Sequence, residues 1–466
     1  MSLRSDQREV AERLIGLLER YSLAALWAPP GWGKSYITAW IIRQLRGRWV
    51  WSSSLISSLL SPMRALREFG VRAYLSAGRE RLCNYGYSNV DIYYLNKCVN
   101  CILNKPVTID ELAKLDIASI ADYSVLKEIS ETSNIGVCNY NVQERLIRMM
   151  LSKYDTVAVL MNYRRVAKYL RWTDYVVVDE AHNLFVPLLT KVSRRVVEYF
   201  MERVGIDPSI IKEPSLLRDV LREKLLEILT TIFTDELQVN PDDLVNLAES
   251  DILYYDDSDD SLVGVKLHGD IGEMLRSGKK VLVLSATMPP SMSGFPIIRV
   301  PPERTIRAMI PKDSLPITIQ TTQFHKDKIA MLLRKYVDDE TIIFTTHSKD
   351  IPDDIDAVYE DEVRSIDEVC GKVIVLNYFG RFAEGARLNK CHRRVLLYTV
   401  PLLPPSVMTK LKARGVSEED IVVLKIVQSA GRILPNENAE IVLFDKRFQQ
   451  YCPILASYGI QCVDAG

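Results

Sequence analysis

The chain has 466 residues, more than one ordinary domain, so we expect two to four domains. Its net charge is −1, which excludes a global basic field for nucleic acid and leaves such binding to local grooves. Hydrophobic residues make up 47% of the chain, enough for sizeable cores, yet no apolar run is long enough to span a bilayer. The first residues contain no apolar signal segment, so we expect a soluble, cytoplasmic protein.

The first elements in the chain predict a nucleotide-binding loop. Residues 4–20 carry apolar positions at helical spacing. An apolar run, Ser22 to Trp27, then leads into a glycine-bearing loop, and an amphipathic segment, Tyr36 to Leu45, follows it. The loop reads Ala28-Pro29-Pro30-Gly31-Trp32-Gly33-Lys34-Ser35. Such a loop can surround nucleotide phosphates with its N–H groups, with the lysine on the β/γ-phosphates and the hydroxyl on Mg²⁺.

Two features of this region leave alternatives open. Ala28 stands where the strict phosphate-loop pattern has glycine, so a chance Gly-Lys-Ser turn is an alternative for the loop taken alone. Gln7, near the start of the first helix, is a candidate adenine contact, and a solvated residue at a helix start is its alternative. The candidate nucleotide contacts are therefore Gln7, Gly31, Trp32, Gly33, Lys34 and Ser35.

Four of the eight cysteines lie close together, at Cys83, Cys98, Cys101 and Cys138, in the pattern C-x14-C-x2-C-x36-C. Two thiolates at C-x2-C spacing bind one centre without strain, and the outer two can close a loop around it. Scattered buried cysteines are the alternative, but four within 56 residues, against four in the other 410, disfavour it. The spacing suits a 4Fe–4S cluster or a Cys₄ zinc site and does not separate the two.

A pair of carboxylates follows a buried strand further along. Arg48–Ser54 reads as a strand that ends in a hydroxyl-rich loop, and Asp155–Leu160 is another short apolar run. Asp174–Val178 reads as a buried strand of the parallel-sheet kind. This last strand runs into Asp179-Glu180-Ala181-His182. Opposite a phosphate loop, Asp179 would hold Mg²⁺ and Glu180 would orient and deprotonate the attacking water.

The remaining half of the chain predicts an insertion and a second αβ series. Residues 186–265 read as helical, with an acidic, solvated loop at Tyr255–Asp260. A strand at Lys280–Leu284 ends in Ser285-Ala286-Thr287. From about residue 312 come four more strands, and Gln428-Ser429-Ala430-Gly431-Arg432 is expected at a helix start. The four strands are Thr341–Thr345, Lys372–Leu376, Val395–Val400 and Glu440–Phe444.

Taken in order, these motifs resemble those of superfamily 2 helicases of the iron–sulfur, XPD-type branch. The cysteines fall between the phosphate loop and the carboxylate box, where that family inserts its cluster domain. The other motifs that carry the resemblance are Arg4-x-x-Gln7, Gly380-Arg381-Phe382-Ala383-Glu384-Gly385, Gln428-x-x-Gly431-Arg432 and Asp445-Lys446-Arg447-Phe448. The resemblance spans nearly the whole chain and favours 4Fe–4S over zinc.

The resemblance implies an α/β protein with two RecA-like motor domains, an inserted iron–sulfur domain and a helical arch. Motor domain 1 would comprise residues 1–78, 142–185 and 268–305, the cluster domain 79–141, the arch 186–267 and motor domain 2 residues 306–466. It further implies an ATP-dependent 5′→3′ helicase or translocase, a monomer that uses ATP and Mg²⁺ and acts on single-stranded and forked DNA. Lys34, Asp179, Glu180, Gln428 and Arg432 would be its catalytic residues.

Two departures from the family motifs favour an alternative. Pro435 stands where the last motif has a second arginine, and Arg387 stands where the preceding motif has a carboxylate. The missing arginine ordinarily places charge on the γ-phosphate, and such a group can be worth roughly 10³–10⁵ in rate. We therefore expect slower turnover than is usual for the family. The alternative is a nucleotide-gated single-stranded-DNA binding or regulatory paralogue with weak or no hydrolysis.

Overall fold

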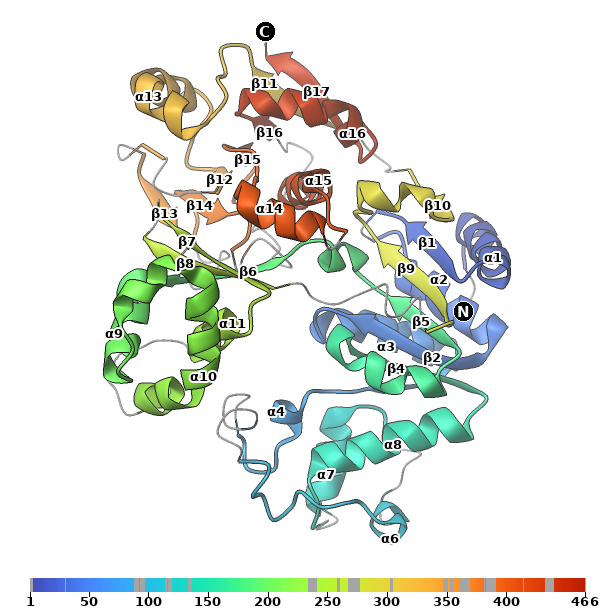
Figure 1. Cartoon of the computed structure of the whole chain (residues 1–466). Helices are drawn as coiled ribbons and strands as arrows, with labels where there is room; N and C mark the ends of the chain where they lie inside the picture. Colours follow the sequence, from blue (N-terminus) through green and yellow to red (C-terminus); the bar gives the residue numbers. More distant parts are fainter. Residues whose placement is uncertain are drawn as a thin grey trace. The chain divides into compact units, whose positions relative to one another are not determined.

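The computed structural model consists of two compact units, which are described separately (Figure 1). The first unit comprises Met1–Leu253, Lys266–Ala286 and Ser293–Val300, and the second comprises Tyr254–Val265, Thr287–Met292 and Pro301–Gly466. The structure describes every residue except 1–2, 30, 88–91, 93–96, 114, 116–119, 133–135, 234–240, 258–259, 267–276, 302–304, 347–350, 353–354, 361, 363–368, 381, 383–390, 414, 432–439 and 466.

The first unit is built on a seven-stranded sheet in the order β10-β1-β9-β5-β2-β4-β3, in which every neighbouring pair is parallel. Most of its strands are near-continuous apolar runs, as expected for a parallel sheet covered on both faces. Because all neighbouring strands are parallel, their carboxyl ends lie along the same side of the sheet. The strands are β1 (Leu23–Trp27), β2 (Gly47–Ser53), β3 (Arg72–Leu75), β4 (Thr156–Asn162), β5 (Tyr175–Val178), β9 (Lys280–Ser285) and β10 (Ile297–Arg299).

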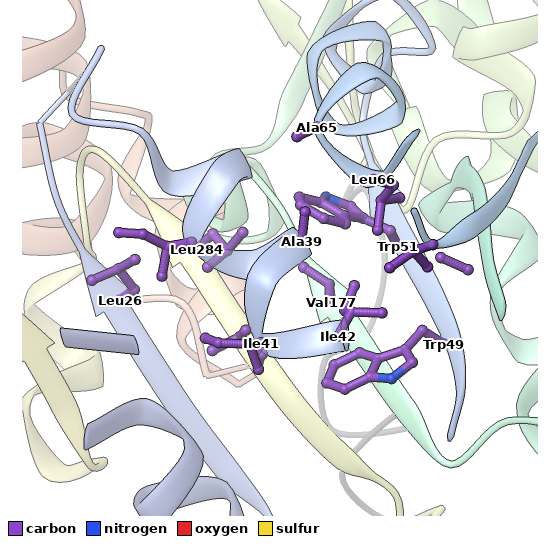
Figure 2. Close-up of a cluster of buried hydrophobic side chains, with 14 of the residues drawn as sticks. Leu26, Ala39, Ile41, Ile42, Trp49, Trp51, Ala65, Leu66, Val177 and Leu284 are labelled. Atoms are coloured by element: carbon purple, nitrogen blue, oxygen red, sulfur yellow. The ribbon is translucent and has the colours of Figure 1, made fainter. Parts of the chain in front are cut away.

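The core of the first unit lies between this sheet and helix α2 (Lys34–Leu45). Figure 2 shows side chains of α2 against the indole rings of Trp49 and Trp51 from β2, and all of these side chains are fully buried. Burying one such side chain contributes about 1.5–3 kcal/mol. Helices α1 (Ser5–Arg20) and α3 (Leu60–Glu68) add to the same core. The phosphate-loop segment thus begins and ends in well-packed elements.

The cysteine-bearing segment lies between β3 and β4 in the chain. Its described helices are α4 (Arg79–Leu82), α6 (Ile109–Ala113), α7 (Tyr123–Thr132) and α8 (Asn139–Lys153). Short 3₁₀ turns occur elsewhere in the first unit: η1 (Ser57–Leu59), η2 (Tyr163–Arg165), η3 (Ala167–Trp172), η4 (Ala181–Leu184) and η5 (Pro208–Lys212).

The segment expected to be helical, residues 186–265, contains strands as well. Helices α9 (Arg194–Arg203), α10 (Pro214–Phe233) and α11 (Pro241–Ala248) are present, together with β6 (Leu188–Ser193), β7 (Ile252–Asp256) and β8 (Ser261–Lys266). The expectation of a solvated loop at Tyr255–Asp260 is wrong at its beginning, since Tyr255 and Asp256 belong to β7. The strand begins with the buried apolar residues Ile252 and Leu253, and it continues to Asp256, within the acidic segment.

The second unit repeats the architecture with a sheet in the order β13-β14-β12-β15-β16-β11-β17, again parallel throughout. The four strands predicted from sequence are β12 (Thr341–Thr345), β14 (Val373–Asn377), β15 (Arg394–Leu397) and β16 (Glu440–Leu443). The others are β11 (Ile306–Pro311), β13 (Ala357–Tyr359) and β17 (Ile460–Ala465). The helices and turns are α13 (Ile319–Leu333), α14 (Pro405–Lys412), α15 (Glu418–Ala430), η9 (Lys446–Tyr451) and α16 (Cys452–Ala456), and η6 (Pro290–Gly294) includes residues of both units.

Two features of the second unit differ from the sequence analysis. Gln428 lies in the last turn of α15 rather than at a helix start, because Ser417 caps the helix through a reciprocal bond pair with Asp420. The four cysteines outside the clustered segment form two disulfides, Cys370–Cys391 and Cys452–Cys462.

Candidate active site

The loop after β1 has the backbone of a phosphate cradle. Gly31 and Gly33 have φ angles of 78° and 101°, which L side chains rarely adopt. Gly33 is the N-cap of α2, whose first N–H groups have no partner within the helix and can receive an anion. A Cβ on Gly33 would lie 2.5 Å from the Nε2 of Gln7, so glycine is required there by close approach as well as by φ.

Gln7 is buried and holds this loop from the side. Its Nε2 donates to the carbonyl of Trp32 at 2.8 Å, and its Oε1 accepts from the N–H of Arg4 at 3.2 Å. The alternative of a solvated helix-start glutamine is therefore wrong, since the residue is only 9% exposed. Adenine contact by Gln7 stays a prediction.

Lys34 and Asp179 lie within electrostatic reach of each other. The Nζ of Lys34 donates to the carbonyl of Ala28 at 3.1 Å, across the loop. Asp179 directly follows β5 and is buried, with Oδ2 accepting from the indole of Trp51 at 3.2 Å and Oδ1 from the N–H of Glu180 at 3.0 Å. Burial and the charge of Glu180 raise the pKa of Asp179 to about 7, while the ammonium of Lys34 opposes that rise.

The backbone at Glu180 is in the left-handed region, with φ 51°. For a residue with a side chain this costs on the order of 1–3 kcal/mol, and such strain concentrates at functional sites. The hydroxyl of Tyr163 donates to the carbonyl of Asp179 and also reaches that of Glu180 at 3.1 Å, which fixes the strained turn. Neither Trp51 nor Tyr163 was identified from sequence, because their roles arise only from tertiary contacts.

Ser285, at the end of β9, joins the carboxylate turn to the phosphate loop. The Nδ1 of His182 lies 3.0 Å from the Oγ of Ser285 and 3.4 Å from the Oε2 of Glu180. The carbonyl of Ser285 accepts from the N–H of Ala28 at 3.2 Å. The sheet order β1-β9-β5 explains this assembly, because three neighbouring strands end beside one another. Ligands of open parallel sheets bind at this carboxyl edge.

Comparison with known proteins gives a match in structure alone. No protein-family profile matches the sequence, and no curated protein matches it. Three solved structures match over almost the whole length of both chains, each at 16% sequence identity. They are "XPD_Helicase" (TM-score 0.67, covering 100% of each chain), "XPD_APO" (0.59, 98% of this chain and 100% of that one) and S. tokodaii Xpd4 (0.53, 99% and 100%).

The chain has the fold of the XPD-type helicases. This finding confirms the predicted pair of RecA-like domains and the resemblance stated from the ordered motifs. At 16% identity the likeness concerns the fold, so activity and substrate are matters for proposal. Among the helices that the structure describes, none is both long and apolar enough to cross a bilayer.

The candidate residues of the second unit are only partly described. Gln428 is on α15, and its Oε1 is buried without a hydrogen-bond partner among the described residues. A buried acceptor of this kind is available for a ligand. Arg432 and the motif residues Arg381, Arg387 and Pro435 lie outside the described residues.

The four clustered cysteines of this XPD-type fold are free thiols, three of them buried and Cys101 partly exposed. Cys83 and Cys98 belong to one buried cluster, and the guanidinium of Arg79 interacts electrostatically with Cys98. Cys138 is the N-cap of α8, and its charge interacts with those of Cys98 and Arg79. Burial raises the pKa of the Cys138 thiol, while the N–H groups of the first turn of α8 oppose that rise.

The thiols are not assembled as a metal centre. Across the part of the chain that the structure describes, no three His, Cys, Asp or Glu side chains form a group placed to hold a metal ion. The donor chemistry of Cys83, Cys98, Cys101 and Cys138 suits a metal cluster, and Cys83 and Cys98 belong to one buried cluster. Among the described residues the four thiols do not converge on one point as ligands of a metal centre do, so the structure by itself does not support a bound cluster.

Proposed function

We propose that this protein is an ATP-dependent motor that moves along single-stranded DNA from 5′ to 3′ and separates forked duplexes. The observation that carries the proposal is the electrostatic interaction between Lys34, in the loop after β1, and the buried Asp179 at the carboxyl edge of the first sheet. A lysine in a glycine-bearing loop, near a buried aspartate that is followed by a partly exposed glutamate, suits phosphoryl transfer to water. The XPD-type fold over the whole chain supports the same reading.

Each residue of the site has a proposed role. Lys34 and the N–H groups at the start of α2 bind the phosphates of ATP. Ser35 and Asp179 hold Mg²⁺, which supplies charge neutralisation on the phosphates when bound. Glu180, held in its strained conformation by Tyr163, orients the attacking water and accepts its proton. Gln428 and Arg432 are the other members of the proposed catalytic set.

The decisive experiment measures ATP hydrolysis with and without single-stranded DNA. We expect DNA to stimulate the wild type, Lys34→Ala to abolish hydrolysis by weakening nucleotide binding, and Glu180→Gln to abolish it with nucleotide binding retained. Lys335→Ala, which removes an exposed lysine outside the site, is the matched control and should behave as the wild type. Equal rates for the wild type and Lys34→Ala would overturn the proposal.

Direction of movement needs its own substrates. Partial duplexes with either a 5′ or a 3′ single-stranded tail should be unwound only from the 5′ tail. Binding to the tail should weaken steeply with salt, because phosphate contacts release counterions. Unwinding from the 3′ tail, or binding that is independent of salt, would contradict this part of the proposal.

The second candidate function is a nucleotide-gated DNA-binding protein with little hydrolysis. It is favoured by Pro435 and Arg387, which replace expected motif residues. In that case ATP would change the affinity for single-stranded DNA while hydrolysis stayed near background. Turnover as fast as in ordinary helicases, unaffected by Arg387→Ala and Arg432→Ala, would exclude roles for these arginines.

We further propose that residues 79–141 form a 4Fe–4S domain inserted in motor domain 1, with residues 186–267 as the arch. The four free thiols and the basic Arg79 beside Cys98 support this assignment. Protein purified without oxygen should be brown and carry about four iron and four sulfide atoms. Cys98→Ser should lose them, whereas a colourless protein that carries zinc would exclude the cluster.

A further inference from the structure

A short connection between β9 and β10 passes from the first unit into the second. Ala286 is the last residue of the first unit at this point, residues 287–292 belong to the second unit, and the chain returns to the first unit at Ser293. A second exit follows at Val300, after which the chain belongs to the second unit. The bonds on either side of Ala286 therefore determine how the chain passes from one unit to the other.

Trp27 anchors both exits in the first unit. It is the last residue of β1, which lies between β9 and β10 in the sheet, and it directly precedes the phosphate loop. Its indole N–H donates to the carbonyl of Ala286 at 3.1 Å, and its own carbonyl accepts from the N–H of Val300 at 2.8 Å. The guanidinium of Arg299, the last residue of β10, lies 4.3 Å from the centre of the indole ring. A single residue next to the phosphate loop thus holds both exits.

Two neighbouring residues of the second unit bind the chain after these exits. The hydroxyl of Tyr458 donates to the carbonyl of Met288. The carbonyl of Gly459 accepts from the N–H of Ile306, the first residue of β11, at 2.8 Å. Both residues lie in the turn between α16 and β17, and the disulfide Cys452–Cys462 joins these two elements. The two segments that enter the second unit here therefore have a common, cross-linked anchor.

The rest of the connection has support that does not involve Tyr458. The N–H of Ser291 donates at 2.9 Å to the Oδ1 of Asp420, a buried carboxylate in the first turn of α15. The N–H of Met292 donates to the carbonyl of Pro289 at 3.0 Å. The connection should therefore stay attached to the second unit when the hydroxyl of Tyr458 is removed.

Between the two anchored carbonyls lie the φ and ψ angles of Thr287 and Met288. A peptide group is planar, so a bond to the carbonyl of Ala286 fixes the orientation of the whole group that joins it to Thr287. The bond from Tyr458 fixes the group that follows Met288 in the same way. Rotation of the chain between the two anchors must therefore occur at Thr287 and Met288, and hinges in proteins are formed by a few such residues.

We propose that Trp27 and Tyr458 are positioning residues that anchor the two ends of a hinge at residues 287–288. The first anchor adjoins the candidate site, because Trp27 precedes the phosphate loop and the Oγ of Ser285 lies 3.0 Å from the Nδ1 of His182 in the carboxylate turn. Rotation at the hinge is thus transmitted to the site through few residues. That DNA binding acts on hydrolysis through this hinge rests on the proposed function, whereas the anchors themselves do not.

Two substitutions each remove one anchoring bond from the full-length protein and keep an aromatic ring. Trp27→Phe removes the indole N–H, and Tyr458→Phe removes the hydroxyl. Trp49→Phe is the matched control, because it removes an indole N–H that donates to the carbonyl of Arg46 at 2.6 Å, in the first unit but away from the connection. Amide hydrogen exchange reports local opening at residues 287–292, and ATP hydrolysis with and without single-stranded DNA reports the coupling.

The loss of either anchor should be visible in both measurements. We expect exchange at residues 287–292 to be about fivefold faster in Trp27→Phe and in Tyr458→Phe, as for the loss of one hydrogen bond, and unchanged in Trp49→Phe. The ratio of hydrolysis rates with and without DNA should fall about fivefold in the same two variants. The double variant should lose no more than either single one, because a hinge without one anchor gains little from the other.

The two measurements separate the hinge from the proposed function. A wild type whose hydrolysis is not stimulated by DNA would end the proposed function, and hydrogen exchange would still test the hinge. Unchanged exchange at residues 287–292 in Trp27→Phe, or equal acceleration in Trp49→Phe, would overturn the hinge. Losses of stimulation that multiply in the double variant would show that the two residues act independently, and would overturn it as well.

Discussion

At the scale of single residues, Gly31 and Gly33 have the same kind of backbone but different surroundings. Both have positive φ, yet a Cβ on Gly31 would meet nothing within 4 Å, whereas one on Gly33 would meet Gln7 at 2.5 Å. Gly31→Ala should therefore cost about 1 kcal/mol from backbone strain alone. Gly33→Ala should cost more and also displace Gln7, which weakens nucleotide binding. Urea unfolding and nucleotide titration of the two variants check this, and equal losses would show that the contact with Gln7 is unimportant.

The raised pKa of Asp179 predicts that the stability of the nucleotide-free protein depends on pH. Its pKa is raised from 3.8 to about 7, so between about pH 4 and pH 7 the folded state holds a proton that the unfolded state has lost. Stability from this group therefore falls as pH rises through that window and stays low above it. Asp179→Asn should remove the fall and stabilise the protein at pH 8 by on the order of 2–4 kcal/mol, as measured by urea unfolding.

Asp174 is the control of opposite sign. Its pKa is lowered, chiefly by the hydrogen bonds from Arg48, whose Nη2 lies 2.6 Å from Oδ1. Its contribution is present above about pH 4 and is lost as pH falls further. Asp174→Asn should therefore destabilise the protein at pH 8. Destabilisation by both variants would contradict the assignment of a strained, buried charge to Asp179.

The residue-level predictions for the first unit came from local spacing. The loop Gly31–Ser35 and the pair after β5 are short sequences whose chemistry depends on neighbours in the chain, so their types could be inferred directly. The contacts of Gln7 and Tyr163 could not, because each depends on a partner from another part of the sheet. The close approach of Glu360 to Gly380 could likewise not be predicted, since only the fold brings the two residues together.

At the scale of elements, a largely buried ion cluster joins α8 to the turns η2 and η3. Glu144 accepts from Arg165 at 2.7 Å and from the hydroxyl of Tyr169 at 2.6 Å, and it also pairs with Lys168. Arg165 in turn donates to the carbonyl of Ala77 at 2.6 Å. Glu144→Ala would leave the buried guanidinium without its counter-charge, so we expect a loss of about 3–5 kcal/mol.

Lys168→Ala provides the comparison for that variant, because its side chain is 42% exposed and its pairing with Glu144 should be worth at most about 1 kcal/mol. Chemical unfolding followed by tryptophan fluorescence measures both. Similar losses in the two variants would show that burial of Arg165 adds nothing to the pair.

Elements were predicted well where an apolar run stands between clear end signals. The strand Thr341–Thr345 has the predicted bounds because all five of its side chains are buried, which makes the run continuous. The start of the helix that carries Gln428 was predicted wrongly, because it depends on the cap at Ser417, which precedes the Gln428–Arg432 motif by eleven residues. The strands β6, β7 and β8 were missed because neighbouring helical patterns dominate that stretch.

At the scale of the whole molecule, the two series of apolar strands form two parallel sheets. The two units differ in their covalent cross-links, which the composition did not predict. Both disulfides, Cys370–Cys391 and Cys452–Cys462, lie in the second unit, while the described cysteines of the first unit are free thiols. The sequence analysis considered clustering alone, and pairing of distant cysteines depends on the fold. Separations of 21 and 10 residues imply about 3 kcal/mol of stabilisation each in the chain-entropy model.

Reduction should therefore act on one unit. Calorimetric melting of the full chain should show two transitions, and a phosphine reductant should lower only the one that belongs to the second unit. The Glu144→Ala variant identifies the other transition, because that residue lies in the first unit. Paired Cys452→Ser and Cys462→Ser substitutions should reproduce part of the shift without reductant. If reductant lowers both transitions equally, or neither, the two disulfides do not stabilise the second unit independently of the first.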